Sequence, residues 1–215
     1  MVKWNIQRFF AAFCGLCALC LGLWGVRTVA TAPDRPPVLL RESPEARETA
    51  QAMLDALCQG DLEAVSRHLS GTPALTQPGN GGEASRRIWQ AYVDSMTYQF
   101  TGPLYGTSQG PAIDVQVDAL DVTALTDRIQ ALVPGLLRRH IAQAKDISEI
   151  YDSGNGYRQD LVDQVLLEAI DAALKESPAT HRTELTLTLR YQAKDWYVLP
   201  DNALILLISG SEIGA

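Results

Sequence analysis

The spacing of apolar residues changes along the chain, and each change marks a different kind of element. From Pro44 to Cys58 the apolar residues recur every three or four positions, which predicts an amphipathic helix with Ser43 as its N-cap. Gly60 is expected to stop this helix, and Asp61 to cap a second short one. The positions expected to face inward on the two helices are Ala50, Met53, Leu54, Leu57, Cys58, Leu62, Val65 and Leu69.

A loop rich in Gly, Pro and Thr over residues 71–82 precedes a third predicted helix, from about Glu83 to Ser95. The spacing then changes to two, which predicts a half-buried antiparallel hairpin with its turn at residues 106–110. The apolar positions of its two strands are Tyr98, Phe100, Leu104, Ile113, Val115, Val117 and Ala119.

The pattern is helical again from Val122 to about Ser177, with a break at residues 152–156. Pro134 lies inside the first half and is expected to kink or divide it. Two further strands are predicted at 184–193 and 196–199, joined by a turn at 194–195, and residues 201–209 read as a capped closing helix. Helices, hairpin, helical pair, hairpin and helix together predict an α+β domain.

The start of the chain has a different composition. Lys3 and Arg8 precede 18 uncharged, mostly apolar residues, Phe9–Val26, which as a helix would span about 27 Å, close to the hydrocarbon thickness of a bilayer. The basic residues would keep the amino terminus inside, so we expect residues 1–30 to be a membrane anchor that exports the rest. A cleaved signal peptide, leaving a secreted protein, is the alternative, although the apolar run is long for one.

Residues 31–42 form a proline-rich segment that is expected to act as an extended stalk. Residues 43–215 are predicted to form one extracytoplasmic domain, with a helical insertion at about 122–177. Beyond the predicted anchor Cys58 is the single cysteine, so the domain must be held by its apolar core and not by an internal disulfide.

Charge narrows the choice of partners. The chain carries 25 acidic and 18 basic residues, and without Lys3, Arg8 and Arg27 the remainder has 15 basic residues and a net charge of −10. A surface with this balance lacks the basic footprint that phosphate neutralisation requires, so a nucleic-acid partner is not expected.

Several local sequences resemble the NTF2-like cone fold, in which a curved antiparallel sheet packs on N-terminal helices. They are Gln59-Gly60-Asp61-Leu62, Tyr92-Val93-Asp94-Ser95-Met96-Thr97-Tyr98, Leu185-Thr186-Leu187-Thr188-Leu189, Lys194-Asp195-Trp196-Tyr197-Val198 and Asn202-Ala203-Leu204. The chain is similar in particular to membrane-anchored or lipidated NTF2-like domains of unknown function from Gram-positive bacteria. This resemblance implies an envelope protein and a possible homodimer, and the long helical insertion departs from the simplest form of the fold.

Candidate chemistry is sparse. Asp114 and Asp118 alternate with apolar residues of a strand and are expected to point to solvent. The three histidines are scattered, and no metal-ligand spacing, nucleophile elbow or cofactor motif occurs, so neither a metal nor a cofactor is expected. The one set of residues that suggests ligand binding is aromatic: Trp89, Tyr92, Tyr98 and Tyr105, whose alternative role is ordinary core packing.

The sequence therefore favours a non-enzymatic, membrane-tethered domain that binds a protein or an envelope component outside the cell. The alternative is a small-molecule binding protein, or an isomerase- or dehydratase-like enzyme, that uses the cavity of the cone. An inward-pointing carboxylate beside Tyr92 or Tyr98 would favour this alternative.

Overall fold

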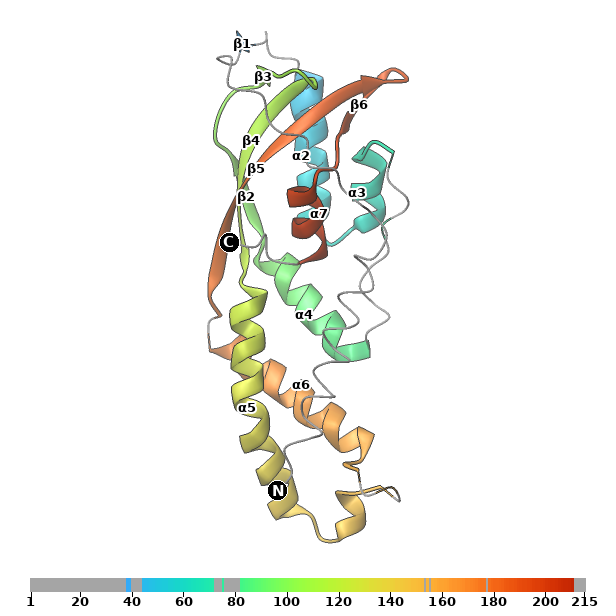
Figure 1. The fold of residues 1–215 in the computed structure, drawn as a ribbon, viewed down its shortest axis with the longest axis vertical. Helices are drawn as coiled ribbons and strands as arrows, with labels where there is room; N and C mark the ends of the chain where they lie inside the picture. Colours follow the sequence, from blue (N-terminus) through green and yellow to red (C-terminus); the bar gives the residue numbers. More distant parts are fainter. Residues whose placement is uncertain are drawn as a thin grey trace. The chain divides into compact units, whose positions relative to one another are not determined.

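The computed structural model describes residues 38–39, 44–71, 75, 82–152, 154, 156–176 and 178–210 (Figure 1). The predicted anchor 1–30, and the predicted stalk apart from residues 38–39, lie outside these residues. The described elements in chain order are β1 Val38–Leu39, α2 Pro44–Cys58, α3 Leu62–His68, α4 Gly82–Ser95, β2 Thr97–Phe100, β3 Tyr105–Gly106, β4 Pro111–Leu120, α5 Val122–Gln143, the 3-10 helix η1 Ile147–Glu149, α6 Gln159–Lys175, β5 Thr180–Gln192, β6 Asp195–Val198 and α7 Asn202–Ser209.

The described strands form one curled antiparallel sheet with the order β1-β3-β4-β5-β6, in which β2 also pairs with β4 (Figure 1). The first predicted hairpin is present, but its first strand is divided into β2 and β3. The interruption contains Gly102 and Pro103, and proline has no N–H to donate to a neighbouring strand. Thr101 N still donates to Asp114 O, and this bond marks the end of the β2 ladder.

The two long strands show the predicted alternation of buried and exposed positions. On β4, Ile113, Val115 and Val117 are buried, whereas Asp114 and Asp118 on the other face are partly exposed. On β5, Leu185, Leu187 and Leu189 are buried in the same way. One face of the sheet is therefore apolar and faces the helices, and the other is polar.

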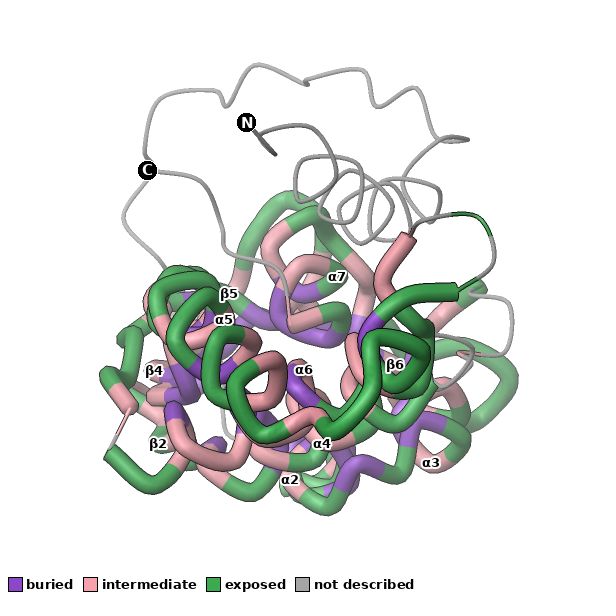
Figure 2. The backbone as a smooth tube through the Cα atoms, turned by 90° about the horizontal axis from the view of Figure 1, so that it is seen from below, coloured by how far each residue is buried: buried purple, intermediate pink, exposed green. Residues whose placement is uncertain are grey.

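The helices that cover the apolar face begin and end close to the predicted positions. α2 begins at Pro44 and buries Met53, Leu54 and Leu57, and the next turn places Gly60 at φ 70°. The Asp61 side chain then accepts a hydrogen bond from Ala64 N and caps α3, as expected. Figure 2 shows the buried positions gathered on the sides of the elements that face one another.

The closing helix and the second hairpin also match their predictions, with small differences in their bounds. Asp201 caps α7 by accepting from Leu204 N, and Leu204, Leu207 and Ile208 are buried. The β5–β6 turn is one residue earlier than predicted, at Ala193 and Lys194, both with positive φ.

The helical insertion connects two strands that are neighbours in the sheet. β4 ends at Leu120 beside Thr180 of β5, and Asp121 N donates to Ala179 O where the insertion begins and ends. Pro134 was predicted to kink or divide the first helix of the insertion. It does not divide it, since α5 runs unbroken from Val122 to Gln143. Pro134 lies on the exposed side of α5, where water can hydrogen-bond the carbonyl that loses its partner.

Ion pairs between elements add to the apolar packing of the insertion. Within it, Arg128 of α5 binds both carboxylate oxygens of Glu176 at 2.6 and 2.8 Å. Arg87 of α4 binds both oxygens of Asp171 on α6 at 2.7 and 2.8 Å, which ties the insertion to the helices on the sheet.

Within the described part of the chain, none of the helices combines the length and the apolar character needed to cross a bilayer. The predicted span Phe9–Val26 falls outside that part.

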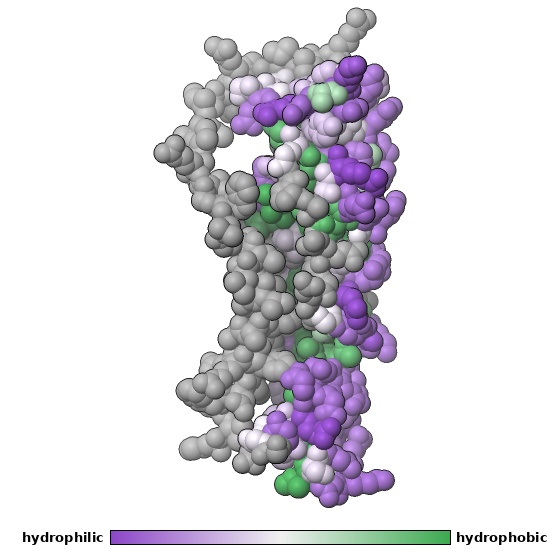
Figure 3. Space-filling view, turned by 90° about the vertical axis from the view of Figure 1, so that its right-hand side faces the viewer, coloured by the Kyte–Doolittle hydropathy of each residue, from purple (hydrophilic) through white to green (hydrophobic). Residues whose placement is uncertain are grey.

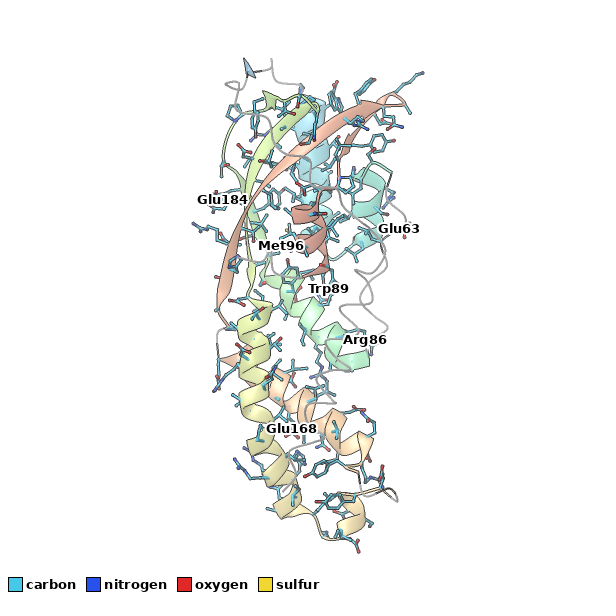
Figure 4. All side chains as sticks on the ribbon, viewed as in Figure 1. Glu63, Arg86, Trp89, Met96, Glu168 and Glu184 are labelled. Atoms are coloured by element: carbon cyan, nitrogen blue, oxygen red, sulfur yellow. The ribbon has the colours of Figure 1, made fainter. Side chains whose placement is uncertain are left out.

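Replacing Leu185 by Ala should lower the free energy of unfolding by about 2–5 kcal/mol, because its side chain is 5% exposed between the sheet and the helices. The matched control is Glu184→Ala, since Glu184 is the neighbouring residue on the outer face (Figure 4), and its effect should stay within about 0.5 kcal/mol. Urea unfolding measures both. A larger loss for the Glu184 variant would show that the two faces are assigned in reverse.

Replacing Arg87 by Met should loosen α6, since it removes the bidentate pair with Asp171. Partly exposed pairs contribute up to about 1 kcal/mol, so amide hydrogen exchange in α6 should rise by about two- to fivefold. Arg86→Met is the control, because Arg86 pairs only with Glu83 of its own helix among the ion pairs of the described residues. Equal exchange in the two variants would contradict the tie between α4 and α6.

Candidate functional site

Two of the four aromatic residues proposed from the sequence lie side by side on α4. The ring centroids of Trp89 and Tyr92 are 5.7 Å apart. Tyr92 is 5% exposed, and its hydroxyl donates to Leu207 O of α7 at 2.8 Å. Gly210, in the left-handed conformation at the end of α7, lies against both rings. These two residues therefore hold the closing helix in place.

Tyr98 lies on the apolar face of the sheet, opposite Val117 in the register of β2 and β4. Its hydroxyl donates to Asp55 Oδ1 of α2, and its ring packs edge-on against Phe100 with centroids 5.7 Å apart. Burial raises the pKa of the Tyr98 hydroxyl well above its ordinary value, and the hydrogen bond to Asp55 adds to this shift. Tyr98 thus remains a neutral donor throughout the physiological pH range.

Tyr105 lies on the opposite face of the sheet. It stands beside Ala112 in the register, and its hydroxyl donates to Asp114 Oδ1 at 2.8 Å on the outer face. Asp114 also accepts from Thr186 Oγ1 at 2.7 Å. Burial, followed by the bond to Asp114, raises the pKa of Tyr105. The structure therefore does not place Tyr105 on one surface with the other three aromatic residues.

A group that the sequence reasoning missed gathers around the end of α2. Asp55 and Cys58 are three residues apart on this helix and share a face, but their association with Tyr98 depends on the packing of α2 beside β2, for which the sequence carries no local signal. Burial raises the pKa of the half-buried Cys58 thiol, and the Asp55 charge adds to it. A negative charge on Cys58 would in turn disfavour ionisation of Tyr92 and Tyr98.

This group offers a phenol donor, a carboxylate acceptor and a protonated thiol. Asp55 is exposed, so its bond with Tyr98 is open to water at the rim of the apolar face. Such a pair can hydrogen-bond a small polar molecule. General acid–base catalysis would further require a substrate held against it in a place from which water is excluded.

The two strand carboxylates occupy the outer face, as expected. Asp118 binds Arg182 Nε at 2.8 Å and a terminal nitrogen of the same guanidinium at 3.1 Å, and these bonds lower the pKa of its carboxyl. Asp114 is occupied by Tyr105 and Thr186. Both carboxylates therefore stabilise the pairing of neighbouring strands.

The histidines lie apart. His140 of α5 contacts both carboxylate oxygens of Glu168 on α6 at 3.1 Å, and this bond lowers the pKa of Glu168, a residue labelled in Figure 4. His181 is exposed on β5, and His68 ends α3. Among the described residues, no group of three or more His, Cys, Asp or Glu side chains is placed to hold a metal ion.

Fold and site together define an α+β protein with a curled antiparallel sheet, an apolar interior and tyrosines bonded to neighbouring elements. No protein-family model matches the chain, and no curated protein does. A solved structure of YcdA from Bacillus subtilis, described as a candidate lipoprotein, is similar at 14% identity and a TM-score of 0.38. The likeness covers 77% of this chain and 46% of that one, so the chain spans about half the length of that protein.

Replacing Tyr92 by Phe should cost about 0.5–1.5 kcal/mol at neutral pH through loss of the bond to Leu207 O. It should also reduce alkaline unfolding. Burial, and then the proximity of Cys58, raises the pKa of Tyr92 in the folded protein, so its stabilising contribution is complete below about pH 10 and declines above it.

Denaturant unfolding between pH 8 and 12 measures this slope, with Tyr191→Phe as the control because Tyr191 is 60% exposed. Equal alkaline slopes for the wild type and the Tyr92 variant would contradict the environment assigned to Tyr92.

Proposed function

We propose that this chain is a membrane-tethered, extracytoplasmic NTF2-like domain that binds a protein or an envelope component and does not catalyse a reaction. Its tether would be Phe9–Val26, its spacer residues 31–42, and its binding domain residues 43–215. A secreted form released at the end of residues 1–30 remains the alternative mode of export.

The arrangement of elements supports the NTF2-like assignment. N-terminal helices α2, α3 and α4 precede a curved antiparallel sheet, and α2 packs on the sheet near β5 and β6. β4 and β5 are neighbours in the sheet, so removing the insertion from this arrangement leaves a meander closed by α7. This is the layout that the resemblance in the sequence implies.

The observation that best supports a binding role is that three tyrosine hydroxyls form structural hydrogen bonds. Tyr92 donates to Leu207 O, Tyr98 to Asp55 and Tyr105 to Asp114, so each joins two parts of the fold. Apart from Tyr92, every polar or charged side chain among the described residues is at least partly exposed. Ligand recognition by the surface therefore agrees better with this chemistry than a reaction inside the domain.

The surface itself suits an aqueous compartment. In the view of Figure 3 the described part is mainly hydrophilic, with smaller apolar areas between.

Self-association through the sheet would have to bring together polar outer faces that carry Asp114, Asp118 and Arg182, so a homodimer of this kind would be held by polar contacts.

One observation favours the second candidate, a small-molecule site. The Asp55 carboxylate lies beside Tyr98, with Cys58 near both, and this is the pairing that a ligand-binding or isomerase-like role would need. Asp55→Asn keeps the shape and removes the charge. Loss of binding to a small-molecule library in this variant, with surface binding intact, would support the second candidate over the first.

Protease added to protoplasts that express the full chain should degrade residues 43–215, because the proposed topology places them outside the membrane. A cytoplasmic enzyme of the host is the control and must stay intact. Alkaline carbonate washing and the mass of the amino-terminal peptide distinguish a retained anchor from a cleaved signal. Survival of the domain in protoplasts and its loss after permeabilisation would contradict the proposed function.

A further inference from the structure

The end of the second hairpin carries an exposed aromatic pair. Tyr191 of β5 and Trp196 of β6 are cross-strand partners, with ring centroids 5.3 Å apart and planes inclined by 56°. Tyr191 is 60% exposed, whereas Trp196 is partly buried against the core. The exposed ring is therefore supported by one that is anchored in the domain.

The turn beside this pair is short and basic. Ala193 and Lys194 both have positive φ, 52° and 78°, as in the tight two-residue turns that match the twist of a hairpin. Arg190 and Lys194 are exposed at this end of the hairpin, with Arg190 on the face opposite to the aromatic pair, and Asp195 is the first residue of β6. We refer to Arg190, Tyr191, Lys194 and Trp196 as the aromatic-basic platform.

The described chain begins at the same end of the sheet (Figure 1). Val38 of β1 pairs with Gly106 of β3, which pairs with Pro111 at the start of β4. Gly110 packs so closely against the Leu189 carbonyl of β5 that a Cβ there would clash with its oxygen. Leu189 is two residues before Tyr191, so the platform and the entry of the chain lie at one end.

The sequence between the predicted span and β1 is short. Residues 27–37 separate Val26 from Val38, and even fully extended they reach no more than about 40 Å. If Phe9–Val26 crosses the membrane, this linker therefore limits the start of β1 to within about 40 Å of the bilayer.

We infer that the aromatic-basic platform rests on the headgroup region of the phospholipid bilayer that the chain's own amino-terminal segment enters. This inference depends on the proposed membrane tether. Tyr and Trp rings favour the membrane interface, where an apolar ring and a polar tip are both accommodated. Arg190 and Lys194 supply charge that complements lipid phosphates, on a domain whose overall charge is negative. The contact would orient the domain with its helical insertion away from the membrane.

The test uses the full chain reconstituted in vesicles of phosphatidylglycerol and phosphatidylcholine, with the photoreactive residue p-benzoylphenylalanine in place of Tyr191. Illumination should attach phospholipid to the protein, measured by mass, at a yield at least about fivefold above a control with the same residue in place of Tyr151. Tyr151 is also an exposed aromatic residue, 38% exposed, but it lies in the turn between α5 and α6. Equal yields at the two positions, or attachment of Tyr191 to a second copy of the chain, would overturn the inference.

A second variant separates charge from ring insertion. Arg190→Glu combined with Lys194→Glu should reduce lipid attachment at position 191 in phosphatidylglycerol vesicles, and the matched pair Arg138→Glu with Arg139→Glu on the exposed side of α5 should leave it unchanged. Cosedimentation of every variant with the vesicles reports on the tether by itself. Cosedimentation without attachment at position 191 rejects the platform and keeps the proposed function, whereas absence of cosedimentation rejects the tether.

Discussion

The antiparallel pairing of β4 with β5 is the constraint on which the rest of the structure depends. Nine residue pairs, from Ala112↔Thr188 to Leu120↔Thr180, place the inward leucines of β5 beside the inward branched residues of β4. A shift by one residue would turn every buried side chain toward water, so the apolar face allows one register only. Helices α2, α4 and α7 then bury their own apolar sides against this face.

The same pairing explains how the domain carries a long insertion. Because β4 and β5 are joined at Asp121 and Ala179 by a backbone hydrogen bond, the helical pair between them leaves and returns at one point. The insertion forms its own contacts, including Arg128 with Glu176 and His140 with Glu168, and it meets the helices on the sheet through Arg87 and Asp171. The buried residues of the insertion, among them Leu125, Ile129 and Ile170, belong to the same apolar core as the sheet and its helices.

Hydrogen bonds of polar side chains join neighbouring helices and strands. The tyrosine hydroxyls and the strand carboxylates are bonded to partners on other helices or strands, and these bonds fix the positions of α7 on α4 and of β2 on α2. A buried hydroxyl without a partner would be costly, so each bond specifies which surfaces meet.

Local patterns in the sequence were enough to predict most elements, because caps and periodicity involve residues that are neighbours in the chain. Asp61 and Asp201 cap helices as predicted, and the alternation from Ile113 to Ala119 identified the buried face of β4.

Other features of the structure depend on contacts between residues that are distant in the sequence. The association of Asp55 with Tyr98 needs α2 to pack beside β2. The place of Tyr105 on the outer face, by contrast, follows from the alternation of Tyr98, Phe100 and Leu104. The tolerance of Pro134 depends on which side of α5 faces water, and that side is set by the packing of α5 against α6. Local sequence thus determined the elements and their buried faces, whereas the grouping of side chains into candidate sites was decided by tertiary packing, because it brings together residues whose separation along the chain carries no periodic signal.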